Sequence, residues 1–292
     1  MPPLHLPVTV SNRKQIHKSR SGLEWFMKGM TGIFIALMFA LAVSAGCVSA
    51  PAGNAPVPAT TVVQEVRPHY VIGGDRDFPP FTSQDAPGNF TGFDIEAARW
   101  VAGREGIDVT FVAVPWDSIV PALENKTIDL VWSGMTVTES RQARVNFSVP
   151  YYSTNQSIAA RAGSPFTVQD LNLGRLRVGV QEGSSEAEWV TDTLIRTGKM
   201  PASNLSRYPD ITTLTAALEN GTVDVSIVQL PSQQHAIQDR PLVIIGTTPS
   251  QDTYAVAVRK TDTALLGTVN DGLVQLMNDP SWQQLKEKYR LA

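Results

Sequence analysis

An internal repeat is the feature that most constrains the fold of this 292-residue chain. Residues 122–129 (ALENKTID) match residues 217–224 (ALENGTVD) at six of eight positions, and each copy lies where a helix is expected to lead into a strand. A chance similarity between two helix–turn–strand units is the alternative. It is the weaker explanation, because the copies fall at equivalent places in two runs of alternating strand and helix patterns. The chain is therefore expected to build a similar unit twice.

Both runs alternate short apolar stretches with segments of helical apolar spacing. The first predicts strands at residues 70–72, 109–114 and 128–132 and helices at 92–106 and 116–124; the second predicts strands at 176–180, 205–208 and 223–228 and helices at 185–195 and 211–219. Gly73 and Gly74 are expected to break the first strand. A β-α-β-α-β order predicts a mostly parallel sheet with right-handed crossovers. The predicted fold is α/β with two lobes, each a mostly parallel sheet flanked by helices.

Two extended segments, near residues 155–161 and 248–256, are expected to cross between the lobes as a two-strand hinge. A strand at residues 253–259 and helices at 263–277 and 280–289 then return to the first lobe. The expected organisation is lobe 1 at residues 67–154 and 254–292, and lobe 2 at residues 155–253 with the hinge strands.

The N-terminal region has the layout of a signal peptide. Basic residues precede an apolar run at residues 29–45, and small residues lead to Cys47, the single cysteine of the chain. The run resembles a lipoprotein signal, so residues 1–47 are expected to be a leader with lipid attachment at Cys47. An uncleaved membrane-spanning helix and a start at Met27 rather than Met1 are alternatives. Residues 48–66, rich in proline and alanine, predict an extended linker.

Composition excludes several classes of function. Without residues 1–47 the chain has 19 basic and 26 acidic residues, a net charge of −7, and no cluster of lysine or arginine. Nucleic acid is therefore not an expected partner, because phosphate binding needs a basic surface. A single cysteine excludes an intrachain disulfide, and no H-E-x-x-H or G-x-S-x-G motif occurs, so neither a metal nor a cofactor is expected.

Small and hydroxyl residues follow the predicted strand at 128–132. A glycine, two threonines and Arg141 occur together within residues 133–141 (SGMTVTESR). In open α/β sheets, ligands bind outside the carboxyl ends of strands, and the planar fork of arginine matches a carboxylate. The stretch predicts a site for a small carboxylate, with a surface turn and a solvated arginine as the alternative.

Six segments in order and register resemble the extracytoplasmic amino-acid-binding proteins of ABC transporters, the family 3, polar-amino-acid type of solute-binding protein. The likeness covers residues 70–289 and implies a two-lobed periplasmic-binding-protein-like fold. It also implies a monomer that holds an amino acid or related small carboxylate between its lobes and acts with an ABC permease. Together with the lipoprotein-like leader, this predicts a protein tethered by a lipid to the outer face of the cell membrane. The six segments are residues 75–81 (DRDFPPF), 92–95 (GFDI), 116–123 (WDSIVPAL), 133–141, 147–152 (FSVPYY) and 178–185 (VGVQEGSS).

The resemblance also implies roles for single residues. Arg141 would bind the ligand carboxylate with the backbone N–H groups of Thr136 and Ser185, and the carbonyl of Gly134 and hydroxyl of Thr136 would accept from the ammonium group. Phe78 and Trp116 would enclose the ligand side chain, while Asp75 and Gln181 would set selectivity. The expected ligand-binding set is Asp75, Phe78, Trp116, Ser133, Gly134, Thr136, Arg141, Gln181, Ser184, Ser185 and Gln229.

Gln229 departs from the family pattern, because relatives that bind α-amino acids usually carry an acidic residue there. A neutral amide contributes about 1 kcal/mol as a hydrogen-bond partner, against roughly 1.5–3 kcal/mol for a charged one. Asp75 or Asp77 could compensate, or the ligand could be a carboxylate other than a standard amino acid.

Two other functions are weighed against ligand delivery. The first is a secreted enzyme, since related folds host dehydratases such as cyclohexadienyl dehydratase; Asp75 and Asp77 are its candidate acids or bases. His69 opens a strand and His235 lies in a polar helix, so neither is a convincing catalyst. The second is a ligand sensor for a membrane partner.

Overall fold

The computed structural model describes residues 66–291. The chain divides into two units, residues 1–61 and 62–292, and all described residues belong to the second. The predicted leader, its Cys47 and almost all of the linker lie outside the described residues. Among residues 66–291, no helix combines the length and apolar character needed to cross a membrane.

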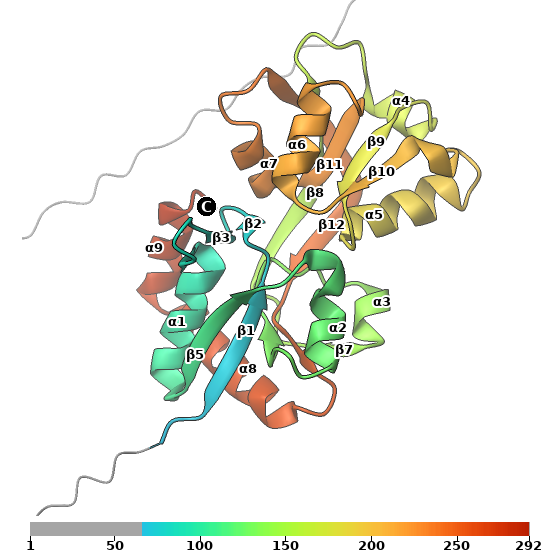
Figure 1. Cartoon of the computed structure of the whole chain (residues 1–292). Helices are drawn as coiled ribbons and strands as arrows, with labels where there is room; N and C mark the ends of the chain where they lie inside the picture. The colour runs from blue at the N-terminus through green and yellow to red at the C-terminus, as the bar shows by residue number, and fades with distance from the viewer. Residues whose placement is uncertain (1–65, 292) are drawn as a thin grey trace, which may run out of the picture. The chain divides into compact units, whose positions relative to one another are not determined.

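The first lobe is defined by a five-stranded sheet with the strand order β5-β1-β6-β13-β7. Figure 1 labels its strands β1, β5 and β7. Its strands are β1 (His69–Gly74), β5 (Asp108–Ala113), β6 (Leu130–Val131), β7 (Val145–Phe147) and β13 (Ala257–Arg259). β1, β5 and β6 are parallel, while β13 pairs antiparallel with β6 and β7. A small antiparallel sheet of β2 (Asp77–Phe78), β3 (Thr82–Gln84) and β4 (Phe90–Thr91) follows β1.

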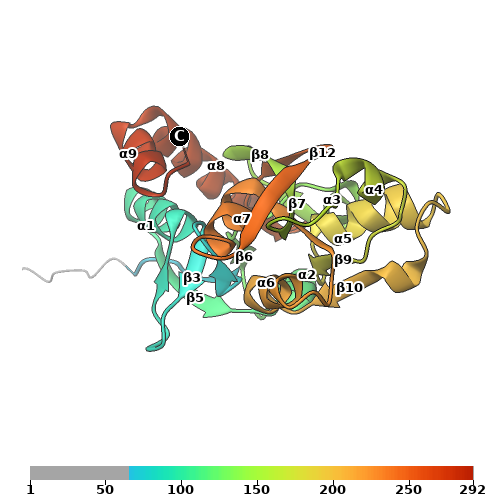
Figure 2. The same cartoon turned by 90° about the horizontal axis from the view of Figure 1, so that it is seen from above.

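Helices from both ends of the described chain pack on this lobe. They are α1 (Phe93–Glu105), the 3₁₀ turn Trp116–Ser118 leading into α2 (Ile119–Glu124), α3 (Glu139–Gln142), α8 (Thr263–Asn278) and α9 (Pro280–Lys288). α8 and α9 contact α1, and the three helices lie together in the two views (Figures 1 and 2). The C-terminal helices therefore complete the lobe that the N-terminal strands begin.

The second lobe is defined by a five-stranded sheet with the order β10-β9-β11-β8-β12. Its strands are β8 (Tyr152–Arg161), β9 (Val178–Gln181), β10 (Leu205–Tyr208), β11 (Val225–Gln229) and β12 (Leu242–Tyr254), and its helices are α4 (Val168–Asn172), α5 (Ser185–Val190), α6 (Ile211–Glu219) and α7 (Leu230–Ala236). β9, β10 and β11 are parallel, and β8 is antiparallel to both β11 and β12. Its parallel strands have the same arrangement as those of the first lobe, so the sequence repeat corresponds to a repeat of structure.

The α/β class and the two sheets flanked by helices confirm the predicted fold, but each sheet is mixed rather than mostly parallel. Two of the four neighbouring pairs in each sheet are antiparallel. The reason is that β8 leaves the first lobe and β12 returns to it, so they run in opposite directions along the second sheet. The chain continues from β12 into β13, which therefore runs antiparallel to its neighbour β6 in the first sheet.

Several predicted boundaries were wrong, and three of them are informative. β1 continues through Gly73 and Gly74 because both pair with β5, and a side chain at Gly73 would lie 2.4 Å from Ile128. The predicted strand at residues 253–259 divides between β12 and β13, because its two parts pair in different sheets. The predicted helix at residues 185–195 changes to a π-helical turn at Thr191.

The two lobes are in contact in this structure. One buried apolar cluster includes Phe81 and Trp132 of the first lobe, Ile211 and Val228 of the second, and Tyr254 at the end of β12. Near this point β8 and β12 pair side by side, with Tyr254 opposite Tyr152. β8 and β12 thus connect the two lobes. The carboxyl ends of β1 and β6 in the first lobe and of β9 and β11 in the second lie close to this connection.

Candidate ligand-binding site

A narrow cavity lies between the two lobes, which are closed on each other in this structure. Asp75 follows β1, Gly134 comes shortly after β6, and Gln181 and Gln229 end β9 and β11. The cavity is thus formed at the carboxyl ends of strands from both sheets, where ligands of open α/β sheets bind. Its lining residues are Asp75, Phe78, Trp116, Gly134, Thr136, Arg141, Gln181, Ser184, Ser185 and Gln229.

Ten of the eleven residues expected at the site line this cavity, and Ser133 does not. Ser133 is buried below it, where its hydroxyl accepts from the backbone N–H of Asp75 at 3.0 Å and lies 2.7 Å from the hydroxyl of Thr82. Ser133 therefore fixes the end of β1 against the end of β6, and its polar group is fully used within the protein.

Arg141 lies between the lobes. Thr138 caps the short helix α3 by accepting from the backbone N–H of Arg141 at 3.3 Å. The guanidinium donates through Nη1 to the carbonyl of Thr136 at 2.7 Å and through Nη2 across the cleft to the carbonyl of Gly183 at 3.0 Å. Its Cζ atom lies 5.5 Å from the centre of the Trp116 ring, within range of a cation–π interaction.

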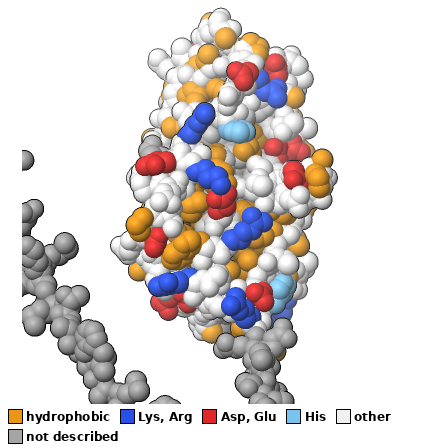
Figure 3. Space-filling model, turned by 90° about the vertical axis from the view of Figure 1, so that its left-hand side faces the viewer, with side chains coloured by type: hydrophobic (Ala, Val, Ile, Leu, Met, Phe, Trp, Pro, Cys, Tyr) orange, Lys and Arg blue, Asp and Glu red, His pale blue; other side chains and the backbone are white. Residues whose placement is uncertain are grey.

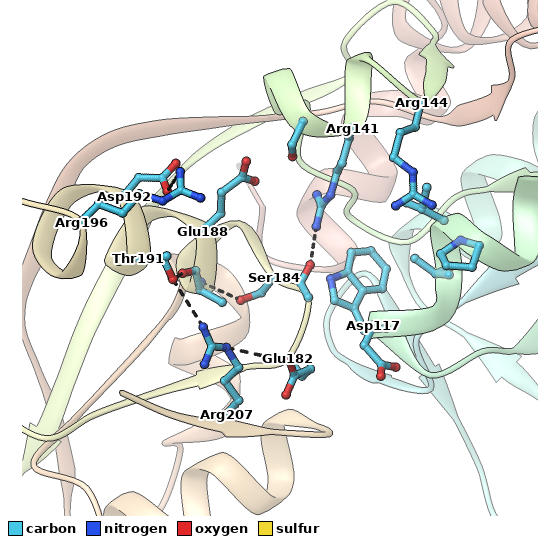
Figure 4. Close-up of a pocket in the computed structure, with 17 residues that line it drawn as sticks. Asp117, Arg141, Arg144, Glu182, Ser184, Glu188, Thr191, Asp192, Arg196 and Arg207 are labelled. Carbon is cyan, nitrogen blue, oxygen red and sulfur yellow. Dashed lines mark hydrogen bonds and ion pairs between the residues drawn. The ribbon is translucent and has the colours of Figure 1, made fainter. Parts of the chain in front are cut away.

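The Arg141 guanidinium is a buried positive charge. Burial lowers its pKa, while the acidic groups Glu186, Glu188 and Asp252 act in the opposite direction. Arginine nonetheless stays protonated in proteins. Figure 4 shows its side chain directed toward the part of the second lobe that carries Ser184. A carboxylate in the cavity could receive hydrogen bonds from this group.

Gly134 occupies a position that requires glycine. Its φ angle of +53° lies in the left-handed region, and a Cβ atom would be 2.4 Å from Cε1 of Phe78. The backbone N–H of Gly134 donates to Oδ2 of Asp94 at 2.5 Å, and the same oxygen accepts from the hydroxyl of Tyr151 at 2.8 Å. Burial raises the pKa of Asp94 to about 7. Asp94 thus fixes the loop that carries Gly134, a role that the sequence did not reveal.

The acidic groups proposed from sequence to compensate for Gln229 are both engaged. Asp75 accepts from Nε2 of Gln181 at 2.6 Å and from the backbone N–H of Asp77 at 2.9 Å. Burial raises the pKa of Asp75, while its bond to Gln181 opposes that rise. Asp77 accepts from the backbone N–H of Thr212, at the start of α6, at 2.7 Å. The bonds from Gln181 to Asp75 and from Thr212 to Asp77 each join the two lobes.

Two buried acidic residues next to the site were missed. Asp252 of β12 lies behind the cavity, where its Oδ2 accepts from the hydroxyl of Ser185 at 3.1 Å. Glu186 is also buried, and its burial, followed by the charge of Asp252, raises its pKa to about 8. No sequence signal pointed to either residue: Asp252 lies 116 residues from Thr136, to which it is hydrogen-bonded.

A more open groove continues from the cavity toward solvent and shares Trp116, Arg141 and Ser184 with it. Figure 4 shows charged side chains along the groove, several of them paired. Two pairs lie within the groove, Arg196 with Asp192 at 2.7 Å and Arg207 with Glu182 at 3.9 Å. Arg144 of the groove pairs with Glu124, which does not line it. Acidic and basic side chains are also interspersed on the face drawn in Figure 3. Within residues 66–291, no group of three or more His, Cys, Asp or Glu could hold a metal ion.

A fold of two lobes with a buried polar cavity between them defines a class of ligand-binding protein that encloses its ligand. Residues 70–292 match the model of the bacterial extracellular solute-binding proteins, family 3. The chain belongs to that family, which the resemblance in its sequence motifs had indicated.

The chain is similar to individual proteins of known structure or described function. It is 28% identical over 224 residues to a probable histidine-binding protein of Neisseria gonorrhoeae, covering 75% of this chain and 82% of that protein. A mutant of ArgBP from T. maritima is 31% identical, with a TM-score of 0.69 and coverage of 77% and 96%. An ancestral amino-acid-binding protein, AncCDT-1, described as a precursor of cyclohexadienyl dehydratase, is 30% identical, with a TM-score of 0.68 and coverage of 76% and 95%.

Proposed function

We propose that this protein captures an amino acid between its two lobes and delivers it to an ABC permease. The observation that carries the proposal is the buried guanidinium of Arg141, which lines an enclosed cavity and donates to both lobes. A carboxylate bound there would replace carbonyl acceptors with a charged acceptor and strengthen the hydrogen bonds. The relatives described as histidine-binding and arginine-binding proteins support the choice of an amino acid.

The other walls of the cavity suit the rest of an amino acid. Phe78 and Trp116 offer aromatic faces to a ligand side chain, and Asp75 with Gln181 offers polar atoms that would discriminate between side chains. Ser184 and Ser185 lie at the start of α5, with Ser184 as its N-cap. Their surroundings favour an anion, because free N–H groups point out of a helix N-terminus.

Closure of the lobes is the conformational step of the proposed function. Arg141 to Gly183, Asp75 to Gln181 and the Asp77 carboxylate to the Thr212 N–H all bridge the lobes. These contacts can form only when the lobes approach each other. Opening about the paired strands β8 and β12 would admit the ligand, and closure would remove it from water.

The proposed setting is the outer face of the cell membrane. Lipid attachment at Cys47 would tether the protein as a monomer, with the proline-rich residues 48–66 as a spacer. Labelling with a radioactive fatty acid tests this directly. The full chain is expected to incorporate label and Cys47→Ala is expected not to; equal labelling of the two would exclude attachment at Cys47.

A dehydratase is the second candidate, because AncCDT-1 is described as a precursor of such an enzyme. The Asp75 carboxylate lines the cavity, but both of its oxygens accept hydrogen bonds within the protein. We therefore propose a binding protein rather than an enzyme. Conversion of prephenate by the purified chain would favour the second candidate.

A thermal-shift panel of the common amino acids and related small carboxylates tests the proposed function. A ligand present at 100 times its dissociation constant adds about 2.7 kcal/mol to the free energy of unfolding, which such a panel detects as a higher melting temperature. One amino acid, or a few that are chemically related, are expected to raise it. If no amino acid does so at millimolar concentration, the proposed function is wrong.

A further inference from the structure

Three polar groups that line the cavity direct hydrogen bonds at one oxygen atom of Asp252. Its Oδ2 accepts from the hydroxyl of Thr136 at 3.2 Å, the hydroxyl of Ser185 at 3.1 Å and Nε2 of Gln229 at 3.1 Å. The two hydroxyls are also 3.3 Å apart, but a carboxylate is the stronger acceptor. Nε2 of Gln229 also donates to the hydroxyl of Ser185 at 3.1 Å. Because their protons are used within the protein, the two hydroxyls can act toward the cavity only as acceptors, through the lone pair that each has left.

The orientation of Gln229 follows from the same contact. An ionised carboxylate only accepts hydrogen bonds, so the NH₂ end of the amide faces Asp252. Among the hydrogen bonds of the described residues, none involves Oε1 of Gln229. Gln229 lines the cavity, so this carbonyl oxygen can accept a hydrogen bond from a ligand bound there.

Asp252 is a buried carboxyl group whose direct hydrogen-bond donors are all neutral. Its side chain belongs to a residue only 4% exposed, and its other donor, Nε2 of Gln156, is neutral. No salt bridge within residues 66–291 includes Asp252. Buried charges are normally paired, because removing them from water is costly. A positive group in the cavity would supply the missing charge.

We propose that Asp252 provides the negative charge that pairs with the ammonium group of the ligand, acting through Gln229, Thr136 and Ser185. The ammonium group donates to Oε1 of Gln229 and to the hydroxyl oxygens, and Asp252 lies one hydrogen bond behind them. The charge that Gln229 lacks is thus supplied from the hinge strand β12. This inference rests on the proposed amino-acid function and names the residue that selects for the amino group.

The subsite draws on both lobes and on the strand that joins them. Thr136 belongs to the first lobe and is bridged to Tyr254 of β12, two residues from Asp252. Ser185 and Gln229 belong to the second lobe, and the hydroxyls of Thr136 and Ser185 are 3.3 Å apart. A ligand ammonium group bound here would therefore contact both lobes.

Asp252→Asn in the full chain tests the proposal by isothermal titration. The probes are L-histidine, L-arginine and L-glutamine, each with the matching acid that lacks the α-amino group. Asp252→Asn is expected to weaken binding of the amino acid by about 10- to 100-fold and to change binding of the matching acid by less than about threefold. An equal loss for both probes, or no loss for either, overturns the proposal.

A second pair of variants excludes a merely structural role. The double variant Gln229→Asp with Asp252→Asn moves the carboxylate from position 252 to position 229. This variant is expected to regain most of the affinity for the amino acid that Asp252→Asn loses. Gln229→Met leaves Asp252 in place and removes the acceptor Oε1, so it should show the same selective loss even if Asp252→Asn fails to fold. Failure of both expectations overturns the proposal. If no amino acid binds the wild-type chain, it is the proposed function that fails instead.

Discussion

Replacing Arg141 by methionine removes the group on which carboxylate binding depends while keeping a long apolar stem. The guanidinium makes two charge-assisted hydrogen bonds and lies 5.5 Å from the centre of the Trp116 ring. Truncating one partner of a buried, hydrogen-bonded charge pair costs about 2–5 kcal/mol. At about 1.4 kcal/mol for each factor of ten, the dissociation constant should rise between roughly 30-fold and a few thousand-fold.

The assay is isothermal titration of the variant with the amino acid that binds the wild-type chain most tightly. Arg144→Met is the matched control, because Arg144 lies three residues further along the chain and is about half exposed, in an ion pair with Glu124. Pairs of this kind contribute about 0–1 kcal/mol, so the control should bind within about fivefold of wild type. If Arg141→Met also binds within fivefold while remaining folded, Arg141 is not the carboxylate ligand.

Three further predictions concern stability and closure. Burial raises the pKa of Glu186 from its ordinary 4.5 to about 8, so the folded protein binds this proton more tightly than the unfolded chain does. The protonated side chain therefore stabilises the fold fully below pH 4.5, and this contribution is lost as the pH rises toward 8. Glu186→Gln should therefore flatten the decline of unfolding free energy between pH 5 and 8, measured by urea unfolding, by up to about 1.4 kcal/mol per pH unit; an unchanged slope contradicts this. Gly134→Ala should lower stability by about 1–3 kcal/mol in the same assay and abolish binding, because its Cβ would meet Phe78; wild-type affinity would contradict the geometry of the loop. Asp77→Ala should weaken ligand binding by roughly 2- to 10-fold by removing the contact to the N–H of Thr212, and an unchanged dissociation constant would show that this contact does not stabilise closure.

The order of the elements was predictable from the sequence because it depends on local patterns. Apolar spacing identified the strands and helices, and the repeat at residues 122–129 and 217–224 identified the duplicated unit. The mixed direction of the strands was not predictable in this way. It depends on where β8 and β12 cross between the lobes, which local spacing does not record.

The residues of the cavity were predictable to the extent that they follow strands in recognisable motifs. Gly134 and Arg141 come soon after β6, and Gln181 ends β9, so their place at the carboxyl ends of strands could be inferred. Ser133 also follows β6, directly before Gly134. Its hydroxyl nevertheless points into the protein, where it bonds to Asp75 and Thr82 instead of facing the cavity. Which neighbour of a strand end faces the ligand is set by packing, not by spacing.

Asp252 could not be placed at the site from sequence because it reaches the site from far along the chain. It is 116 residues from Thr136, to which it is hydrogen-bonded. The pairing of β12 with β8 also shifts its register between Thr247 and Gln251, so partners across the hinge cannot be counted along the strand. The sequence showed that Gln229 lacks the expected acidic group. Only the structure could show that Asp252 lies within hydrogen-bonding distance of Gln229.

Isothermal titration of the purified chain with the common amino acids tests the central claim most directly. If the protein captures an amino acid between its lobes, one amino acid or a chemically related few should bind at one molecule per chain. If none of them releases or absorbs heat in buffers of different ionisation enthalpy, and none changes the melting temperature, this protein does not capture an amino acid and the account is wrong.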